Sequence, residues 1–194
     1  MERNTIIVGL LMLVVGLGVG YASNGNSLGS RGVGHMMPNG SMMGQNIDQH
    51  FITEMIPHHE GAIEMAKIAL ERSKRPEMLS LAQGIIEAQE REITDMSGWY
   101  QSWYGSTPPE GGMGMRMGGM TGEPDVLKSV SDAEFDREFI TEMIPHHEMA
   151  VMMGQMLQAS TERSEMKQLA DNIITSQSRE IEMMRGWLKL WYGQ

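Results

Sequence analysis

The sequence FITEMIPHHE occupies residues 51–60 of this chain and occurs again, unchanged, at residues 139–148. The alignment extends without a gap on both sides, so that His50–Gly105 matches Glu138–Gly193 at a constant offset of 88 residues. Of the 56 aligned positions, 29 are identical, which chance does not produce. Because a repeated unit of this kind cannot usually bury its apolar face alone, we expect the two copies to pack together.

Each copy has the apolar spacing of two helices. In the first copy, apolar residues recur every three or four positions from Ile52 to Leu70, and a second stripe begins at Ala82. Pro76 suits the start of the second helix and Gly105 its end, and the short connection between the stripes predicts an antiparallel hairpin. No segment has the pattern of a strand. The sequence therefore predicts an all-α fold, an antiparallel four-helix bundle built from two repeated helical hairpins and a Met/Gly/Pro-rich crossover.

The composition changes along the chain and predicts five parts. These are a signal peptide over 1–22, a Met/Gly-rich mobile arm over 23–46, a first hairpin over 47–105, a Met/Gly/Pro-rich linker over 106–131 and a second hairpin over 132–194. Arg3 precedes an apolar run from Ile6 to Tyr21, with small residues before Ser23. A membrane span needs about 20 apolar residues, so we favour a cleaved signal peptide over an uncleaved anchor. Either form predicts a periplasmic or secreted protein, and only the anchor predicts contact with a membrane.

The overall composition excludes several classes of function. The chain has 25 Asp and Glu against 15 Lys and Arg, a net charge of −10, and nucleic-acid phosphates would repel it. It has no Cys, which excludes disulfides, thiolate nucleophiles and cysteine-held zinc or iron–sulfur sites. It has 22 Met in 194 residues, an unusual abundance of thioether groups.

Pro57 and Pro145 lie inside the apolar stripes, directly before the paired histidines of each copy. A proline in a helix interior removes an amide donor and crowds the carbonyl four residues earlier. The helix therefore either kinks at the proline or starts afresh with the proline in its first turn. Both alternatives predict that the histidine pairs lie near an end of the bundle.

Histidine and methionine share helix faces in both copies. Met55 lies three and four residues before its histidine pair, as Met143 does in the second copy, and side chains at these spacings are neighbours on a helix. Imidazole and thioether ligands favour Cu(I), and the isoelectronic Ag(I), over hard cations. If the first hairpin turns near residues 74–75, Gln89, Glu92 and Met96 come within reach of the pair, as do Gln177, Glu180, Met183 and Met184 in the second copy. The resulting candidate ligands are His58, His59, His146 and His147 with Met55, Met96, Met143, Met149, Met152, Met153, Met156, Met183 and Met184.

Not every methionine needs a metal to explain it. Methionine is a flexible filler of apolar cores, and this interpretation suits Met65, Met78 and Met166. The methionines that lie among glycines are different, because no core could use them. They are Met36, Met37, Met42, Met43, Met113, Met115, Met117 and Met120, and we interpret them as weak, multivalent metal-capture groups.

The motif M-I-P-H-H followed by A-I-x-M-A, and then L-A…I-I…Q-x-R-E-I…M…W…W, resembles a family of secreted helical domains of unknown function. The tandem form with Met-rich linkers is similar to periplasmic copper-binding proteins of copper resistance. The resemblance covers residues 50–105 and 138–193. It implies a four-helix bundle that binds Cu(I), Cu(II) or Ag(I) through Met55, His58, His59, Met65 and Met96 in the first copy, and through Met143, His146, His147, Met153 and Met184 in the second.

The two copies differ at candidate ligands. His50, a further candidate in the first copy, is replaced by Glu138, whereas Glu64 is replaced by Met152 and Asp95 by Met183. The second copy is therefore richer in thioethers, and we expect it to prefer Cu(I).

The favoured function is a non-enzymatic copper binder for sequestration or delivery, with no catalytic residues. Its expected partners are copper ions and a copper sensor, transporter or acceptor protein. One alternative is a di-metal oxidase, but such bundles need Glu-x-x-His, and the residue three positions before His58 is Met55. A second alternative is a module whose methionine surface binds a protein partner.

Overall fold

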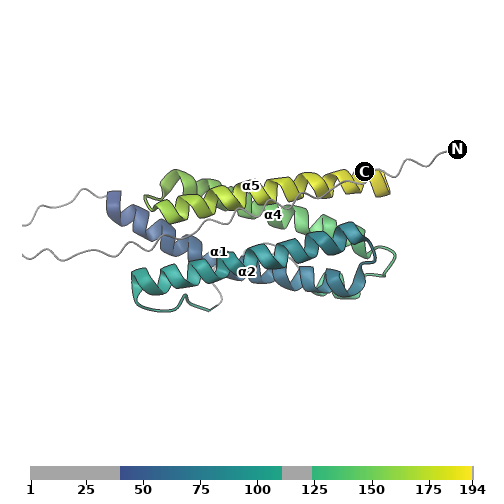
Figure 1. Ribbon diagram of the computed structural model, residues 1–194, viewed down its shortest axis with the longest axis horizontal. Coiled ribbons are helices and arrows are strands. Elements are labelled where there is room, and N and C mark those ends of the chain that lie inside the picture. The colour runs from purple at the N-terminus through teal and green to yellow at the C-terminus, as the bar shows by residue number, and fades with distance from the viewer. Residues whose placement is uncertain (1–39, 111–123, 194) are drawn as a thin grey trace, which may run out of the picture. The chain divides into compact units, whose positions relative to one another are not determined.

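The computed structural model describes residues 40–110 and 124–193, and the side chains of residues 47–110 and 124–193. The helices are α1 (Gly40–Arg72), α2 (Pro76–Tyr104), α3 (Pro124–Ser129), α4 (Phe135–Ser160) and α5 (Ser164–Trp187), followed by the π-helical turn η1 (Leu188–Tyr192) (Figure 1). These residues contain no strand, which confirms the all-α prediction. The expected signal peptide lies outside the described residues.

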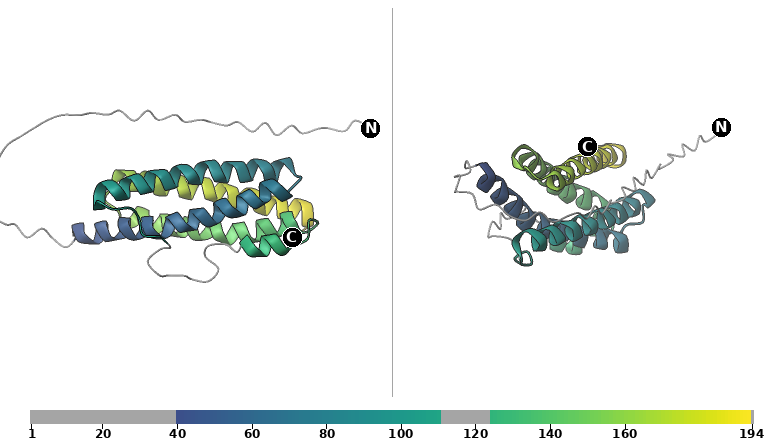
Figure 2. Two further views of the ribbon diagram at one scale, coloured as in Figure 1. Left: turned by 90° about the horizontal axis from the view of Figure 1, so that it is seen from below. Right: turned by 60° about the vertical axis from the view of Figure 1, so that its left-hand side comes forward.

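The four long helices form two hairpins. Helix α1 packs on α2, α4 packs on α5, and contacts between α1 and α4 join the two hairpins (Figures 1 and 2). Helix α2 begins at Pro76, where a missing amide hydrogen costs nothing. It ends before Gly105, whose φ of 73° is readily adopted only by glycine and whose N–H donates to the carbonyl of Gln101 (3.0 Å). The repeated-hairpin prediction and both ends of this helix are confirmed.

Helix α1 continues through Pro57 and α4 continues through Pro145. Neither proline starts a new helix, so the histidine pairs lie in the middle of these helices. The expectation that they lie near an end of the bundle is wrong. An interior proline costs about 3 kcal/mol, and the apolar residues that α1 and α4 bury on both sides of it offset this cost.

The core consists of two clusters of buried apolar residues. We call them the Phe51 cluster, which includes Met55, Met96 and Met166, and the Phe139 cluster, which includes Met65, Met78, Met143 and Met184. All four long helices contribute to both clusters. Along α1 the change from one cluster to the other falls between Met55 and Ala62, and along α4 it falls between Met143 and Ala150. Both changes occur at the paired histidines.

An arginine from each hairpin turn reaches the other hairpin, where it meets a tryptophan ring and an aspartate. We call these contacts the turn clasps. Arg75 lies 4.3 Å from the ring centre of Trp191 and 3.1 Å from Asp136, and Arg163 lies 3.9 Å from the ring centre of Trp103 and 3.2 Å from Asp48. The two clasps occupy equivalent positions of the repeat. The repeat in the sequence is therefore also a repeat of contacts between the hairpins.

Two segments differ from the expected boundaries. Helix α1 begins at Gly40, within the stretch for which we expected a mobile arm, and α3 forms within the expected linker. Leu127 of α3 is buried in the Phe139 cluster, and Arg72 donates hydrogen bonds to the carbonyl oxygens of Leu127 and Val130. These contacts attach α3 to the core and to the end of α1. Within residues 40–110 and 124–193, none of the helices has the length and apolar character that crossing a membrane would need.

Candidate metal centre

His58 of α1 and His146 of α4 meet where the two hairpins touch. Their ring centres are 3.7 Å apart and the rings are tilted by 40°. Both side chains are buried, as are those of their neighbours His59 and His147. We call these four residues the histidine layer. It separates the Phe51 cluster from the Phe139 cluster, and it brings the two copies of the repeated motif together.

The rings of His58 and His146 lack hydrogen-bond partners. Neither nitrogen of either ring has a partner at ordinary hydrogen-bonding distance and angle among the described residues, although each ring interacts with the backbone of the other histidine. A neutral imidazole offers one N–H donor and one lone pair, and leaving a buried group of this kind unsatisfied costs about 1–3 kcal/mol. Burial, with smaller contributions from the neighbouring His59 and His147, lowers the pKa of His58 to about 3. Burial likewise lowers the pKa of His146 well below 6.5. Both rings are therefore neutral at physiological pH, with lone pairs available to a ligand.

His59 and His147 each have a carboxylate partner on the returning helix. Nε2 of His59 lies 2.7 Å from Oε2 of Glu92, and Nε2 of His147 lies 2.7 Å from Oε2 of Glu180. An ionised carboxylate can only accept, so Nε2 carries the hydrogen, and in a neutral imidazole this tautomer leaves the lone pair on Nδ1. Nδ1 of both histidines is buried without a partner. Carboxylates commonly orient metal-binding histidines in this way.

Buried thioethers flank these histidine–carboxylate pairs. Met55 lies four residues before His59, and Met96 lies four residues after Glu92, so both are one turn away in the same direction along the antiparallel hairpin. Both are fully buried in the Phe51 cluster. Met143 and Met184 hold the equivalent positions in the second copy, in the Phe139 cluster. The structure therefore contains two equivalent candidate centres: Met55, His58, His59 and Met96 form the first, and Met143, His146, His147 and Met184 form the second.

The other candidate ligands lie outside these two groups. His50 is half-buried, two turns or about 12 Å before His58 along α1. Met65 is fully buried in the Phe139 cluster, at the opposite side of the histidine layer from Met55. Met183 is half-buried against the Phe139 cluster. On α4, Met149 and Met153 are half-buried, whereas Met152 and Met156 are exposed.

The methionines of the arm and linker lie outside the part of the chain that the structure describes. For Met42 and Met43 this applies to the side chains, since the backbone there belongs to α1.

Four polar residues that the sequence placed within reach of the histidine pairs, without counting them as ligands, belong to the neighbourhood of the site. Glu92 and Glu180 orient histidines, and Gln89 and Gln177 are buried with side-chain oxygens that have no partner among the described residues. The signal was available in the sequence. The motif Q-x-R-E-I occurs in both copies, and polar residues that interrupt an apolar helix stripe twice at the same position indicate a shared internal role.

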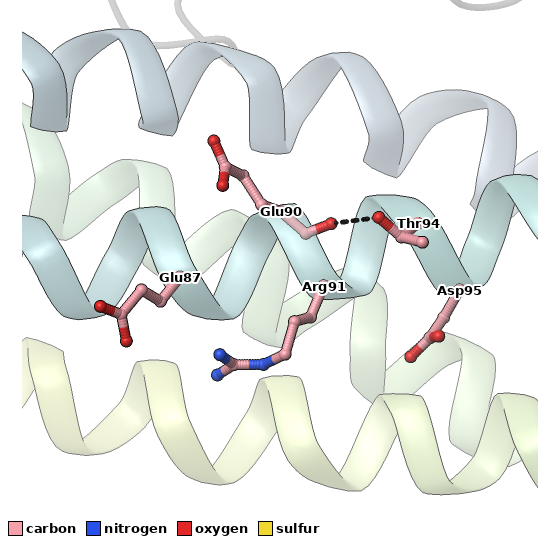
Figure 3. Close-up of a pocket in the computed structure, with 5 residues that line it drawn as sticks. All are labelled: Glu87, Glu90, Arg91, Thr94 and Asp95. Carbon is pink, nitrogen blue, oxygen red and sulfur yellow. Dashed lines mark hydrogen bonds between the residues drawn. The ribbon is translucent and has the colours of Figure 1, made fainter.

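Sites built from oxygen ligands are not evident. No group of three His, Asp or Glu side chains suited to a metal ion occurs in residues 47–110 and 124–193. A surface hollow is lined by Glu87, Glu90, Arg91, Thr94 and Asp95, all of α2 (Figure 3). The hydroxyl of Thr94 donates to the carbonyl of Glu90 (2.8 Å). None of the residues that line this hollow has an imidazole or thioether group.

Comparison with known proteins gives related structures and a family. The chain is similar to CopM in its Cu(I)-bound form, at 48% identity and a TM-score of 0.67, over 75% of this chain and 97% of that one. For the Cu(II)-bound form of CopM the identity is 49% and the TM-score 0.69, with the same coverage. Structures of CopM with Ag bound are also similar. A DUF305 protein from Streptomyces coelicolor, described as a candidate secreted protein, is 27% identical with a TM-score of 0.66, over 73% of this chain and 90% of that one.

A shorter match links the chain to the uncharacterized protein L153 of Acanthamoeba polyphaga mimivirus. It has 42% identity over 50 residues, which are 26% of this chain and a third of the viral protein. The family match is much longer, because residues 48–193 fit the domain of unknown function DUF305 and span both hairpins. This chain is a member of the DUF305 family.

Proposed function

We propose that this protein is an exported, non-enzymatic copper binder that holds Cu(I), Cu(II) and Ag(I) for copper resistance or delivery. The observation that carries the proposal is the set of buried imidazole nitrogens without partners, flanked by fully buried thioethers, in two equivalent copies. Unsatisfied groups of this kind are costly in a core unless a ligand uses them. The bound forms of CopM, with nearly half of its residues identical, support copper and silver as that ligand.

The chemistry of the ligands favours the monovalent ions at the buried centres. Thioether and imidazole are soft or intermediate donors that suit Cu(I) and Ag(I). A thioether has no proton to lose, and His58 and His146 are already neutral, so binding there releases few protons. The lack of cysteine lets such centres persist in an oxidising compartment without disulfide formation.

The proposal also includes how the protein captures ions and in which compartment it works. The methionines of the arm and linker raise the local chance of capturing an ion, and the two centres then hold it. The expected signal peptide and the candidate secreted family member both favour the periplasm or the exterior of the cell. A copper sensor, transporter or acceptor protein would receive the ion. The di-metal oxidase has little support, because among the described residues no group of three histidine and carboxylate side chains is placed to hold a metal ion.

The test is anaerobic competition for Cu(I) against a chromogenic chelator, with a matched pair of variants. Met55→Leu/Met143→Leu removes one thioether from each centre at nearly constant volume. Met78→Leu/Met166→Leu makes the same change at two other fully buried, repeat-equivalent methionines. We expect the first variant to weaken Cu(I) binding at both centres by about tenfold or more, and the second to leave it unchanged.

Replacing His58, His59, His146 and His147 with Ala should abolish tight binding, with circular dichroism to check that the helices persist. Unchanged stoichiometry in that folded variant, or equal affinities in the two methionine variants, would refute the assignment. Anomalous density from crystals soaked in Ag(I) should appear beside the histidine layer.

A further inference from the structure

The two candidate centres are closed to solvent, which raises the question of how an ion reaches them. All four histidines and the four flanking methionines are buried. A metal site needs a path by which the ion can arrive. Moving an ion across an apolar surface without ligands is costly, because the ion loses its hydration. Such a path therefore needs donor groups along it.

Helix α4 has thioethers outside the core that packing does not require. Met152 is 45% exposed and Met156 is 57% exposed, and they are two of the four large exposed apolar side chains among the described residues. Met149 and Met153, on the same helix, are half-buried, and Met153 also packs against the Phe51 cluster. We call these four residues the α4 thioether stripe. Exposed methionine gains no burial energy, so another use accounts for it better than core filling does.

The spacing of the stripe makes its members successive neighbours. Met152 and Met156 are four residues apart, Met149 precedes Met152 by three, and Met153 follows Met149 by four. His146 in turn lies three residues before Met149. Side chains at these spacings have Cβ atoms about 5–6 Å apart, so the sulfur atoms of long side chains can approach one another. Exposure falls in the same order, from Met156 and Met152 to Met149 and Met153 and then to buried His146.

The surroundings favour a soft ion on this path. The nearby carboxylate of Glu148, four residues before Met152, is already paired with Arg185 at 2.5 Å. The first hairpin has no equivalent path, because Gly61, Glu64 and Ile68 stand where α4 has Met149, Met152 and Met156. Glu64 is paired with Lys128 at 2.9 Å.

We propose that the α4 thioether stripe is a solvent-facing capture site for soft monovalent ions, Cu(I) or Ag(I), and conducts them to the histidine layer. This rests on the proposed function. Each step is a ligand exchange in which a bond from the ion to the next sulfur, or finally to a histidine nitrogen, forms as the bond to the outer sulfur breaks. No electron is transferred, and the thioethers have no proton to release.

The test separates the rate of uptake from its equilibrium. The full-length apo protein is mixed anaerobically in a stopped-flow instrument with Cu(I) held by a chromogenic chelator, and the loss of the chelator colour is followed. Met152→Leu/Met156→Leu keeps the volume and the apolar character but removes the exposed sulfur. We expect uptake to slow by about tenfold, because the local capture of ions is lost. The number of tightly bound ions at equilibrium should stay the same, because the buried centres are untouched.

A gain-of-function pair tests the same idea in the first hairpin. Glu64→Met/Ile68→Met adds thioethers at the equivalent positions of α1, and Glu64→Leu/Ile68→Leu is the matched change without sulfur. We expect the methionine pair alone to speed uptake, by about twofold, because it provides a second capture site.

An unchanged rate of uptake in Met152→Leu/Met156→Leu would overturn the proposed capture role of the stripe while leaving the proposed function intact. A lower equilibrium stoichiometry in that variant would also overturn it, because the two methionines would then be ligands of a tight site. Wild-type protein that takes up no Cu(I) would instead refute the proposed function.

Discussion

The two hairpins are nearly the same inside and different outside. Their paired histidines, the carboxylates that orient two of these, and the flanking buried methionines coincide at the 88-residue offset. Their less buried residues diverge, and the methionines gained at these positions all lie in the second hairpin. Gly61, Glu64 and Ile68 of α1 correspond to methionines on α4, and exposed Asp95 of α2 corresponds to Met183 of α5.

This difference suggests that the hairpins share one way of holding an ion and differ in how an ion reaches them. The sequence led us to expect that the second copy prefers Cu(I), because of Met152 and Met183. Met152 is exposed and Met183 only half-buried, so neither belongs to the fully buried group around His147. The Cu(I) preference of the second copy therefore stays a prediction. The exposure of Met152 makes it a residue for the rate of ion uptake rather than for the affinity of the buried centre. Three further experiments bear on the comparison.

The largest expected effect is on the pH dependence of stability. His58 and His146 have pKa values lowered from 6.5, to about 3 for His58, so the folded protein binds fewer protons than the unfolded chain in mildly acidic solution. The free energy of unfolding of the metal-free protein should therefore fall as the pH drops from about 6.5 towards 3, by about 1.4 kcal/mol per pH unit for each histidine. Urea unfolding at several pH values measures the slope.

The matched variants for this experiment are His58→Leu, His146→Leu and the double change. The double variant should flatten the slope in this window and should not lose stability at pH 7, because the unsatisfied polar groups are gone. The two single variants should show the same slope of unfolding free energy against pH, because each of the two rings is the other's neighbour. Different slopes in the single variants would show that the interiors of the two hairpins are not equivalent.

Sequence alone accounted for the parts of the fold that depend on local pattern. The repeat and the stripe spacing predicted the hairpins, and a turn near residues 74–75 correctly placed Glu92 within reach of the histidine pair. The helix ends at Pro76 and Gly105 follow from the backbone chemistry of these two residue types.

The parts of the fold and of the site that the sequence did not predict depend on how the two hairpins pack together. The contact between His58 and His146 joins two helices that no local pattern relates. Continuation of the helix through Pro57 reflects burial on both sides rather than local preference. Met55 and Met65 are both fully buried on α1, yet they belong to different core clusters, on opposite sides of the histidine layer.

A smaller effect is expected from the carboxylates that orient His59 and His147. Glu92→Gln and Glu180→Gln keep the shape of the side chain but remove its charge and weaken its ability to accept the Nε2 hydrogen. Changes of this kind typically weaken metal binding by about 10- to 100-fold. We expect similar losses of Cu(I) affinity in both variants, each limited to one centre, in the chelator competition. A loss in only one variant would break the equivalence of the two interiors.

The smallest effect concerns the turn clasps, which are equivalent in position but differ in burial. The carboxylate of Asp48 is only 2% exposed and burial raises its pKa, whereas the side chain of Asp136 is 16% exposed. Arg163→Ala leaves the more deeply buried carboxylate without its cation, and should cost about 2 kcal/mol of unfolding free energy. Arg75→Ala should cost about 1 kcal/mol, from the lost ring contact and a more accessible ion pair.

Urea unfolding at pH 7 compares the two arginine variants, and Asp48→Asn in the Arg163→Ala background provides the control. Removing the charge of Asp48 should recover part of the loss, because the cost arises from an unpaired buried carboxylate rather than from the tryptophan contact. If Arg75→Ala were the more damaging change, or if Asp48→Asn recovered nothing, the clasps would act mainly through their rings. Equal losses in the two arginine variants would make the two ends of the bundle equivalent in energy as well as in position.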